Sequence, residues 1–124
     1  MTLRCCAIIP SHNHSAVIGE IARELRSKGL FLFIIDDGSG DPHRQILEAL
    51  HTPADGVTVF RLPVNRGKGA AVMKGVELAT AAGFTHALQI DADGQHDLAQ
   101  VPAMLILAEA HPEALIAGAP FFDK

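Results

Sequence analysis

The sequence has no tryptophan and no tyrosine, and its six phenylalanines are scattered along the chain. It therefore offers no aromatic platform on which nucleic-acid bases could stack. Basic residues are also few: 10 lysines and arginines stand against 14 aspartates and glutamates, which gives a formal net charge of −4. An acidic chain without a run of basic residues is not expected to bind nucleic acid.

Cysteine is scarce, since the two cysteines, Cys5 and Cys6, are neighbours in an apolar run. This excludes a disulfide framework, favours a reducing cytoplasmic compartment, and predicts two small core side chains. No apolar run reaches the roughly 18 residues that a membrane-spanning helix needs. Hydrophobic residues nevertheless make up 48% of the 124 residues. That content predicts one domain with a real core and excludes a disordered chain.

Short apolar runs alternate with helical patterns along the chain. The runs are typical of strands covered on both faces, and they lie at residues 4–9, 30–35, 57–62, 85–90 and 114–117. The helical patterns lie at residues 15–28, 42–51, 68–82 and 99–110. The second helix is expected to have Asp41 as its N-cap and Pro42 in its first turn. The alternation predicts an α/β fold with a mostly parallel sheet between two layers of helices.

Polar or glycine-rich segments follow the first four expected strands, at residues 10–14, 36–41, 63–69 and 91–97. In parallel α/β sheets, ligands bind beyond the carboxyl ends of the strands. The four segments are therefore expected to meet at one edge of the sheet and to form a binding site.

Asp91 and Asp93 are the sharpest feature of these segments. At the end of a strand, residues i and i+2 point the same way, so their carboxylates repel each other unless a cation or a proton lies between them. Oxygen ligands suit Mg²⁺ or Mn²⁺, and Gln95 or His96 could add a further ligand. Such an ion could screen the charge of a diphosphate. An ordinary acidic turn is the alternative interpretation.

The segments after the second and third strands also carry candidate residues. Asp37 is expected to lie further out than Asp36 and to accept hydrogen bonds from a base or a ribose. Asp36 is expected to stay near the sheet and to bind loop amides. The segment that contains Arg66 and Lys68 opens a helix, and its amides and cations can hold an anion. Its glycines could instead serve only the close packing of backbone.

The seven histidines do not have the spacing of a metal site. His12 and His14 lie in the first polar segment and are placed to contact a ligand. The other histidines considered are expected to be solvated or half-buried, namely His43, His51, His86 and His111.

Taken together, these segments resemble family 2 glycosyltransferases, most closely the branch that transfers sugars to dolichyl or polyprenyl phosphate. The motifs are IIPSHN at 8–13, IDDGS at 35–39, NRGKGAA at 65–71 and QIDADGQH at 89–96. The resemblance runs from about residue 7 to residue 118. It implies the Rossmann-like GT-A fold, a nucleotide-diphosphate sugar donor, and an inverting transfer to a lipid phosphate, a glycan or another hydroxyl acceptor.

The resemblance also implies roles for single residues. Binding of the nucleotide sugar would fall to Pro10, His12, Asn13, Asp37, Gly67, Lys68 and Asp91. Mg²⁺ or Mn²⁺ would be held against the diphosphate by Asp91, Asp93 and Gln95. This sequence departs from the family at His12 and His14, where an aromatic residue and a glutamate are more usual.

In the family, the carboxylate base that deprotonates the acceptor lies well beyond the metal motif. Residues 1–124 are therefore expected to form a single nucleotide-sugar-binding domain, the N-terminal part of a catalytic domain without its acceptor half. The base is expected beyond residue 124. A sheet truncated in this way would leave an apolar edge that favours a homo-oligomer. The full-length protein is expected at the inner face of a membrane, where a lipid acceptor would lie.

Three other interpretations are open. In a haloacid-dehalogenase-like phosphatase, Asp91 would attack phosphate and Asp93 would act as the general acid and base. That motif normally ends the first strand, whereas here it ends the fourth. A phosphotransfer receiver domain could use Asp36 and Asp37, but no lysine directly follows a late apolar strand. A non-catalytic nucleotide-sugar-binding module would bind the donor without turnover.

Overall fold

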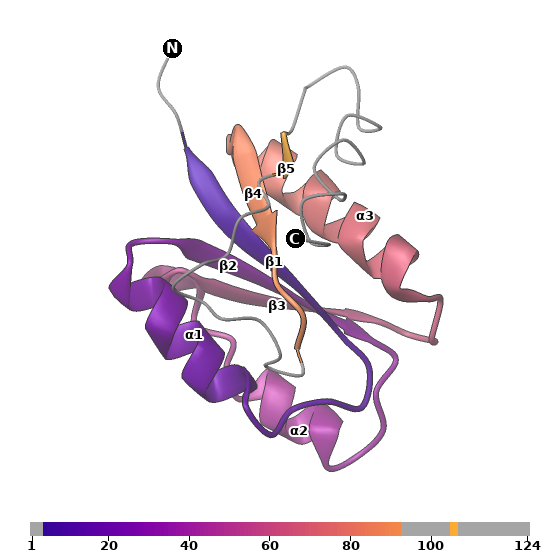
Figure 1. Ribbon diagram of the computed structural model, residues 1–124. Helices are drawn as coiled ribbons and strands as arrows, with labels where there is room; N and C mark the ends of the chain where they lie inside the picture. The colour runs from indigo at the N-terminus through magenta and orange to yellow at the C-terminus, as the bar shows by residue number, and fades with distance from the viewer. Residues whose placement is uncertain (1–3, 93–104, 107–124) are drawn as a thin grey trace.

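A computed structural model describes residues 4–92 and 105–106 of the chain. Within these residues the elements follow the order β1 (Cys5–Ser11), α1 (Ile18–Ser27), β2 (Phe31–Asp37), α2 (His43–Glu48), a 3₁₀ turn (Pro53–Asp55), β3 (Val57–Leu62), α3 (Lys68–Ala81), β4 (His86–Gln89) and β5 (Leu105–Ile106). These strands form one sheet in the order β3-β2-β1-β4-β5. The sheet lies between α1 and α2 on one side and α3 on the other (Figure 1), which confirms the expected three-layer α/β fold.

The order of the strands reverses at β1. β1 pairs in parallel with both β2 and β4, and β2 pairs in parallel with β3. The chain therefore moves outward from β1 to β3 and then returns through α3 to β4, on the far side of β1. Right-handed crossovers that run in opposite directions along a sheet place their helices on opposite faces. The loops that follow β1 and β4 consequently diverge, and ligands bind in such a crevice.

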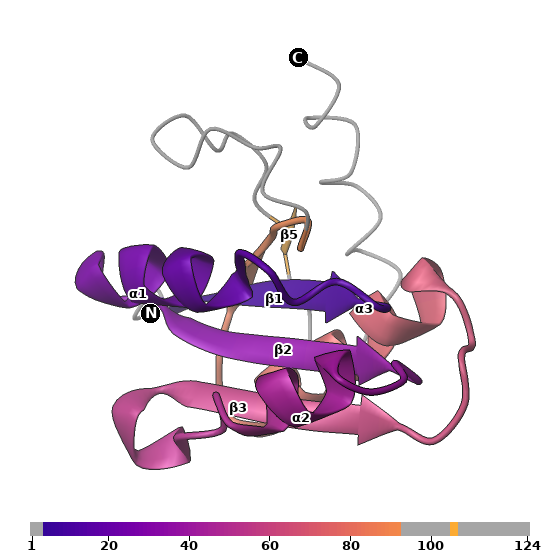
Figure 2. The ribbon, with the colours of Figure 1, turned by 90° about the horizontal axis from the view of Figure 1, so that it is seen from below.

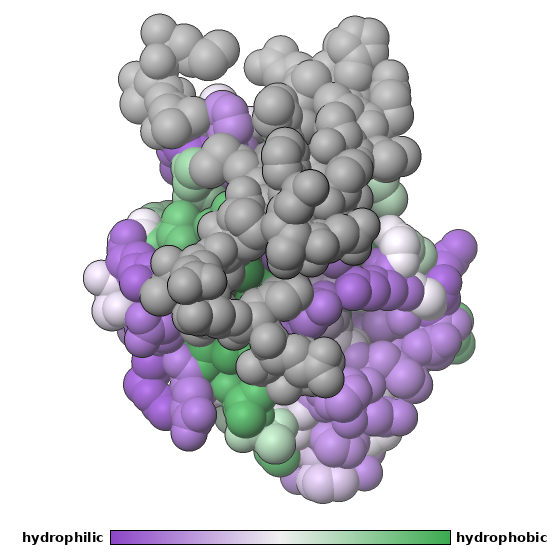
Figure 3. All heavy atoms as spheres, viewed as in Figure 1, coloured by the Kyte–Doolittle hydropathy of each residue, from purple (hydrophilic) through white to green (hydrophobic). Residues whose placement is uncertain are grey.

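The core is divided by β1, whose residues from Cys6 to Ile9 are fully buried. Cys6 and Ile8 belong to the apolar cluster against α3, whereas Ala7 and Ile9 belong to the cluster against α1 and α2. A strand covered on both faces needs apolar residues at every position, which explains the unbroken apolar run. The structure confirms Cys6 as a core residue and leaves Cys5 only partly buried. Figure 3 shows apolar residues gathered in the middle of one view, between hydrophilic flanks.

The helix α3 packs closely against β1 at Gly75. A Cβ atom on Gly75 would lie 2.5 Å from Cγ2 of Ile8, a distance that real Cβ contacts do not show. Ala71 and Ala79, one turn away on either side, are also fully buried. Small side chains on this face of α3 therefore set the distance between the helix and the sheet.

The expected start of α2 is wrong by one residue. Pro42 occupies the N-cap position, and no side chain caps the helix, so Asp41 does not have the predicted capping role. The backbone closes the first turn instead, because the Arg44 amide donates to the Gly40 carbonyl at 3.0 Å. The helix is also shorter than expected and ends at Glu48.

The helix expected at residues 99–110 contains a strand. β5 pairs antiparallel with β4 and places Leu105 opposite Ala87. A short apolar run fits a buried helix and a strand equally well, and the unpaired edge of β4 supplies ladder partners that periodicity does not reveal. The strand expected at residues 114–117 lies outside the described residues. In the part of the chain that the structure describes, no helix is long and apolar enough to cross a membrane.

Candidate functional site

A cavity of about 240 Å³ lies at the carboxyl ends of the strands, where their order reverses. The end of β2 and the loops that follow β1, β3 and β4 contribute to its lining. The lining residues are Pro10, Ser11, His12, His14, Asp37, Asn65, Gly67, Lys68, Ala71, Asp91 and Ala92. The four polar segments recognised in the sequence thus meet at one edge of the sheet, as expected.

Asp36 fastens the loop after β2 to the sheet. Its side chain is fully buried, and its two carboxylate oxygens accept hydrogen bonds from the Ser39 amide and from Nη1 of Arg61, both at 2.9 Å. The same Arg61 nitrogen donates to the Ser39 carbonyl at 2.9 Å. A buried charge is tolerated when it is paired and hydrogen-bonded in this way. Asp36 therefore stays near the sheet and binds a loop amide, as predicted.

Asp37 lines the cavity and Asp36 does not, although both residues are buried, at 2% and 0% exposed. Oδ1 of Asp37 accepts a hydrogen bond from the Arg66 amide at 2.7 Å, and its Oδ2 accepts one from the Gly67 amide at 2.8 Å. Nδ2 of Asn65 also donates to Oδ2, at 3.1 Å. The two amides form an anion-binding nest before α3, as the sequence suggested. The anion in this nest is a carboxylate of the protein itself.

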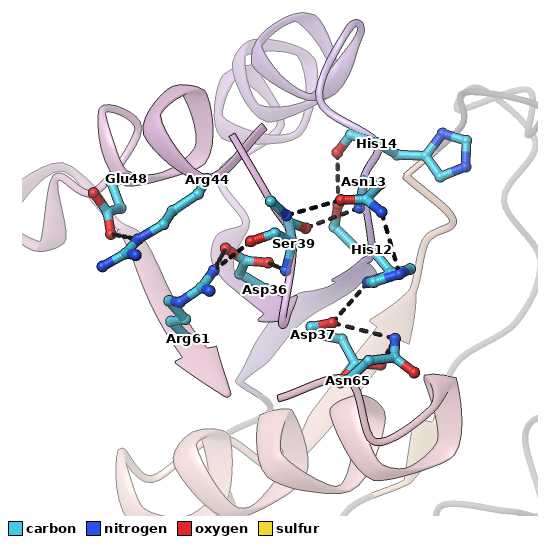
Figure 4. A network of polar contacts seen from close by, with 12 residues as sticks. His12, Asn13, His14, Asp36, Asp37, Ser39, Arg44, Glu48, Arg61 and Asn65 are labelled. Carbon is cyan, nitrogen blue, oxygen red and sulfur yellow. Dashed lines mark hydrogen bonds and ion pairs between the residues drawn. The ribbon is translucent and has the colours of Figure 1, made fainter. Parts of the chain in front are cut away.

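The loop after β1 is tied to the loop after β2. Asn13 adopts a φ of 55°, in the left-handed region that asparagine tolerates better than most residues. Its amide donates to Oγ of Ser39 at 2.8 Å, and its Oδ1 accepts from the Gly40 amide at 2.9 Å. Asn13 is absent from the cavity lining. Its side chain instead holds the two loops together, as Figure 4 shows.

His12 is held in one tautomer by its neighbours. Its Nδ1 lies 2.8 Å from the carbonyl oxygen of Asp37, which can only accept, so Nδ1 carries the proton. Its Nε2 lies 3.3 Å from Nδ2 of Asn13, which donates to it. The ring lines the cavity. The ring of His14 points away from this network in Figure 4.

Lys68 and Asp91 pair on the cavity lining. Nζ of Lys68, the first residue of α3, lies 2.7 Å from Oδ1 of Asp91, which follows β4. The described residues contain no group of three or more His, Cys, Asp and Glu side chains that could hold a metal ion. The other two predicted ligands, Asp93 and Gln95, lie outside the described residues. Asp91 itself fits a divalent cation, because it presents a hard oxygen ligand at a position that already attracts a positive charge.

Three of the remaining histidines behave as expected. His43 is half-buried and lies 3.0 Å from Oγ of Ser15. His51 is exposed, and its Nδ1 accepts a hydrogen bond from the Val59 amide at 2.9 Å. His86 is half-buried. None of the three lines the cavity, and His111 lies outside the described residues.

Arg61 and Asn65 take part in the site, although no role was predicted for either from the sequence. Arg61 lies opposite Asp36 in the register of β2 and β3. A lone charged residue in a mostly apolar strand was the available signal, since a partly buried charge favours a partner. Asn65 lay within a recognised segment, but its contact with Asp37 depends on how two loops meet.

Comparisons with known proteins show the family to which the chain belongs. The sequence model of the family "Glycosyl transferase family 2" matches residues 6–124. The chain therefore belongs to glycosyl transferase family 2. The family match favours neither the phosphatase nor the receiver interpretation.

Two archaeal relatives illustrate the extent of the similarity. An uncharacterized protein of Methanocaldococcus jannaschii is 31% identical over 120 residues, which cover 94% of this chain and 46% of the relative. The UDP-N-acetylglucosamine–dolichyl-phosphate N-acetylglucosaminyltransferase of Methanococcus voltae is 29% identical over 110 residues, which cover 76% of this chain and 44% of that enzyme. The chain thus spans about half the length of the curated relatives that it matches.

A solved structure shows the fold. A mannosyltransferase from Pyrobaculum calidifontis, in complex with GDP-Man and Mn²⁺, superposes with a TM-score of 0.61 at 21% identity, covering 75% of this chain and 28% of that one. The chain has the Rossmann-like GT-A fold that the resemblance implied, and it corresponds to a part of the solved structure.

Proposed function

We propose that this chain is the donor-binding part of a metal-dependent, inverting glycosyltransferase. The proposed reaction transfers a sugar from a nucleotide-diphosphate sugar to a lipid phosphate or another hydroxyl acceptor. The observation that carries the proposal is the cavity at the reversal of strand order, with the Lys68–Asp91 pair on its lining. This is the place where α/β sheets bind their ligands.

The two named relatives support the class of substrates. The Methanococcus voltae enzyme is named for a UDP-sugar donor and a dolichyl-phosphate acceptor. The Pyrobaculum calidifontis enzyme was solved with a GDP-sugar and Mn²⁺. The proposal takes the donor chemistry that the two names share, a nucleotide-diphosphate sugar, and adds the divalent cation of the Pyrobaculum calidifontis complex. A polyprenyl-phosphate acceptor resides in a membrane, so the proposal also places the reaction at the cytoplasmic face of a membrane.

Charge at the cavity suits a diphosphate. The Lys68 side chain is 57% exposed, so its ammonium group can reach a ligand phosphate. Asp91, together with Asp93 and Gln95, would hold Mg²⁺ or Mn²⁺. The bound ion would neutralise charge on the nucleoside diphosphate as it leaves. Pro10, His12 and Gly67 line the same cavity and would contact the nucleotide.

The catalytic base is assigned to none of the described carboxylates at the site. An inverting transfer to a hydroxyl needs a carboxylate that can take a proton from the acceptor. Asp36 and Asp37 are buried, and the oxygens of both accept hydrogen bonds from the protein. Asp91 is paired with Lys68 and belongs to the proposed metal site.

The binding part of the proposal is tested by calorimetric titration of UDP and GDP, with and without Mn²⁺. We expect one nucleotide to bind in a Mn²⁺-dependent manner, and Asp91→Ala to weaken that binding at least about tenfold, the effect of losing one charged ligand. Glu20→Gln is the matched control, because Glu20 is an exposed carboxylate on α1 and is absent from the cavity lining. Equal affinity of Asp91→Ala and the wild type would contradict the proposal.

A non-catalytic nucleotide-sugar-binding module is the second candidate. It is favoured because the described carboxylates at the site already accept hydrogen bonds from, or pair with, other residues of the protein, which leaves none of them assigned as a catalytic base. Incubation of the chain with a radiolabelled donor, Mn²⁺ and dolichyl phosphate separates the two candidates. Product formation that Asp91→Ala abolishes supports a transferase, whereas donor binding without product supports a binding module.

A further inference from the structure

We propose that Lys68 and a divalent cation compete for Asp91, so that a metal ion reaches the Asp91 carboxylate when the lysine moves away from it. The released ammonium group then binds the diphosphate of the donor. Asp91 thus exchanges one positive partner for another as the donor site fills. The inference rests on the proposed function, because it takes Asp91 as a metal ligand and Lys68 as a contact of the diphosphate.

The first argument is the direct contact between the two side chains. Nζ of Lys68 lies 2.7 Å from Oδ1 of Asp91, the distance of a charge-assisted hydrogen bond. Mg²⁺ is held by carboxylate oxygens at about 2.1 Å. An ammonium group and a divalent cation in contact with the same carboxylate would repel each other strongly at such short separations. The ion pair therefore has to open before Asp91 can bind a metal ion tightly.

The second argument is that this pair opens easily. The side chains of Lys68 and Asp91 are 57% and 30% exposed, and ion pairs in contact with solvent are weak. Lys68 is the first residue of α3, and its charge lies at the end of a flexible four-carbon stem. The ammonium group can consequently leave Asp91 while the backbone of the helix stays in place.

The third argument is that the ammonium group has a destination. Lys68 and Asp91 both line the cavity, and Lys68 is the only lysine or arginine among the described lining residues. A phosphate in this cavity would find in Lys68 a compact positive charge of the kind that binds phosphate well. A metal ion on Asp91 and a diphosphate on Lys68 therefore favour each other, and by linkage each raises the affinity of the other by the same factor.

The competition is tested by titration of the chain with Mn²⁺ alone, in the absence of nucleotide. Free Mn²⁺ is followed by electron paramagnetic resonance. We expect Lys68→Met to bind Mn²⁺ about fivefold more tightly than the wild type, the upper range for an ion pair in contact with solvent. Methionine keeps the length and the helix propensity of lysine and removes only the competing charge.

Arg66→Met is the matched control for the general effect of charge. The Arg66 side chain is exposed, lies two residues before Lys68, and forms no ion pair with the residues that the structure describes. Its removal should change the Mn²⁺ affinity less than about twofold, because solvent and salt screen a charge that is not in contact. Equal affinity of Lys68→Met and the wild type would overturn the proposal. An equal gain in Arg66→Met, or Mn²⁺ binding by neither the wild type nor Lys68→Met, would overturn it as well.

The lysine itself supplies a readout that a merely structural role would not move. In a ¹³C-labelled chain, the Cε resonance of Lys68 is assigned by its absence from Lys68→Met. We expect Mg²⁺, a diamagnetic substitute for Mn²⁺, to shift this resonance toward its position in Asp91→Asn, where the carboxylate partner is missing. A Lys68 resonance that stays in place while Mg²⁺ shifts the Asp91 amide would contradict the proposal.

The exchange also predicts how metal and nucleotide depend on each other. The affinity for UDP and GDP is measured by calorimetry with and without Mn²⁺. The factor by which Mn²⁺ raises the affinity should be about fivefold smaller in Lys68→Met than in the wild type, because no ion pair has to open in the variant. An unchanged factor would overturn the proposal. If the wild type bound neither nucleotide, the proposed function would fail, whereas the Mn²⁺ titration without nucleotide would still decide whether Lys68 competes for Asp91.

Discussion

Two adjacent aspartates, Asp36 and Asp37, are both buried at the end of β2. The side chain of each accepts hydrogen bonds from its own partners: Asp36 from Arg61 and Ser39, and Asp37 from the segment before α3. At the scale of single residues, the loops of the site are therefore held by charge-assisted hydrogen bonds. These are about twice as strong as hydrogen bonds between neutral groups.

Removal of Arg61 should expose the cost of a buried charge. We expect Arg61→Met to lower the free energy of unfolding by about 3–5 kcal/mol, because Asp36 would remain buried without its cation. The double variant Arg61→Met/Asp36→Asn should regain part of that loss, since the uncompensated charge is then gone. Urea unfolding followed by circular dichroism measures both. A loss below about 1 kcal/mol, typical of exposed ion pairs, would contradict this account.

Cys6 should make stability fall at alkaline pH. Burial, reinforced by the neighbouring Cys5 and opposed by Arg4, raises the pKa of the Cys6 thiol from 9.0 to about 12. The folded chain therefore keeps this thiol protonated where the unfolded chain has lost the proton. The resulting stabilisation is complete below pH 9 and is lost as the pH rises from 9 to about 12.

The measurement compares urea unfolding of the wild type and Cys6→Ala at pH 8 and pH 10. Between these values the wild type should lose about 1 kcal/mol more than the variant, since a unit of pKa corresponds to about 1.4 kcal/mol. Subtracting the change in the variant from the change in the wild type removes the contribution of the other titrating groups. Identical pH dependence in both proteins would show that Cys6 ionises as easily in the folded state as in the unfolded one.

At the scale of elements, the close contact between α3 and β1 fixes the position of the helix that carries Lys68. We expect Gly75→Ala to lower the free energy of unfolding by about 1–3 kcal/mol, the usual cost of overpacking, because the new Cβ would meet Ile8 at 2.5 Å. Gly69→Ala is the matched control in the same helix, since a Cβ atom on Gly69 would meet nothing within 4 Å. It should be neutral or stabilising by up to about 1 kcal/mol.

Thermal or urea unfolding of the two glycine variants measures the difference. If Gly75→Ala were as stable as Gly69→Ala, the helix would not be held at the distance that the structure shows.

The elements show what the sequence could predict. β3 was expected at residues 57–62 and is found there, because Gly56 and Pro63 bound an apolar run on both sides. α3 was expected at residues 68–82 and ends one residue earlier. β5 was missed, because an apolar pair gains its strand conformation from the edge of β4, which is more than a dozen residues away in sequence.

For the site too, the sequence predicted the placement of the loops but not the contacts between them. The four loops could be brought together from the order of the elements alone, since parallel strands present their carboxyl ends at one edge. The depth of Asp37 could not be predicted, because it depends on two amides in the loop after the next strand. Asn13 was expected to contact a ligand, but whether its side chain faces a cavity or a neighbouring loop is likewise decided by the contact between loops.

At the scale of the whole molecule, the described residues form a sheet with its polar loops concentrated at one end. Figure 2 shows β1, β2 and β3 pointing in the same direction, toward the end where the loops lie. The order β3-β2-β1-β4 puts the reversal of strand order between the loops after β1 and β4. The central proposal is that a nucleotide-diphosphate sugar binds at this end of the sheet.

The most direct test of that claim is a titration of the ¹⁵N-labelled chain with GDP and with UDP in the presence of Mg²⁺, followed through its backbone amides. The account predicts that one nucleotide shifts the amide resonances of Gly38, Gly67, Lys68 and Asp91, around the cavity. Gly29, Gly56 and Gly83, which precede β2, β3 and β4 at the opposite end of the sheet, should not move. Shifts confined to these three glycines, or no shifts with either nucleotide in a folded chain, would contradict the account.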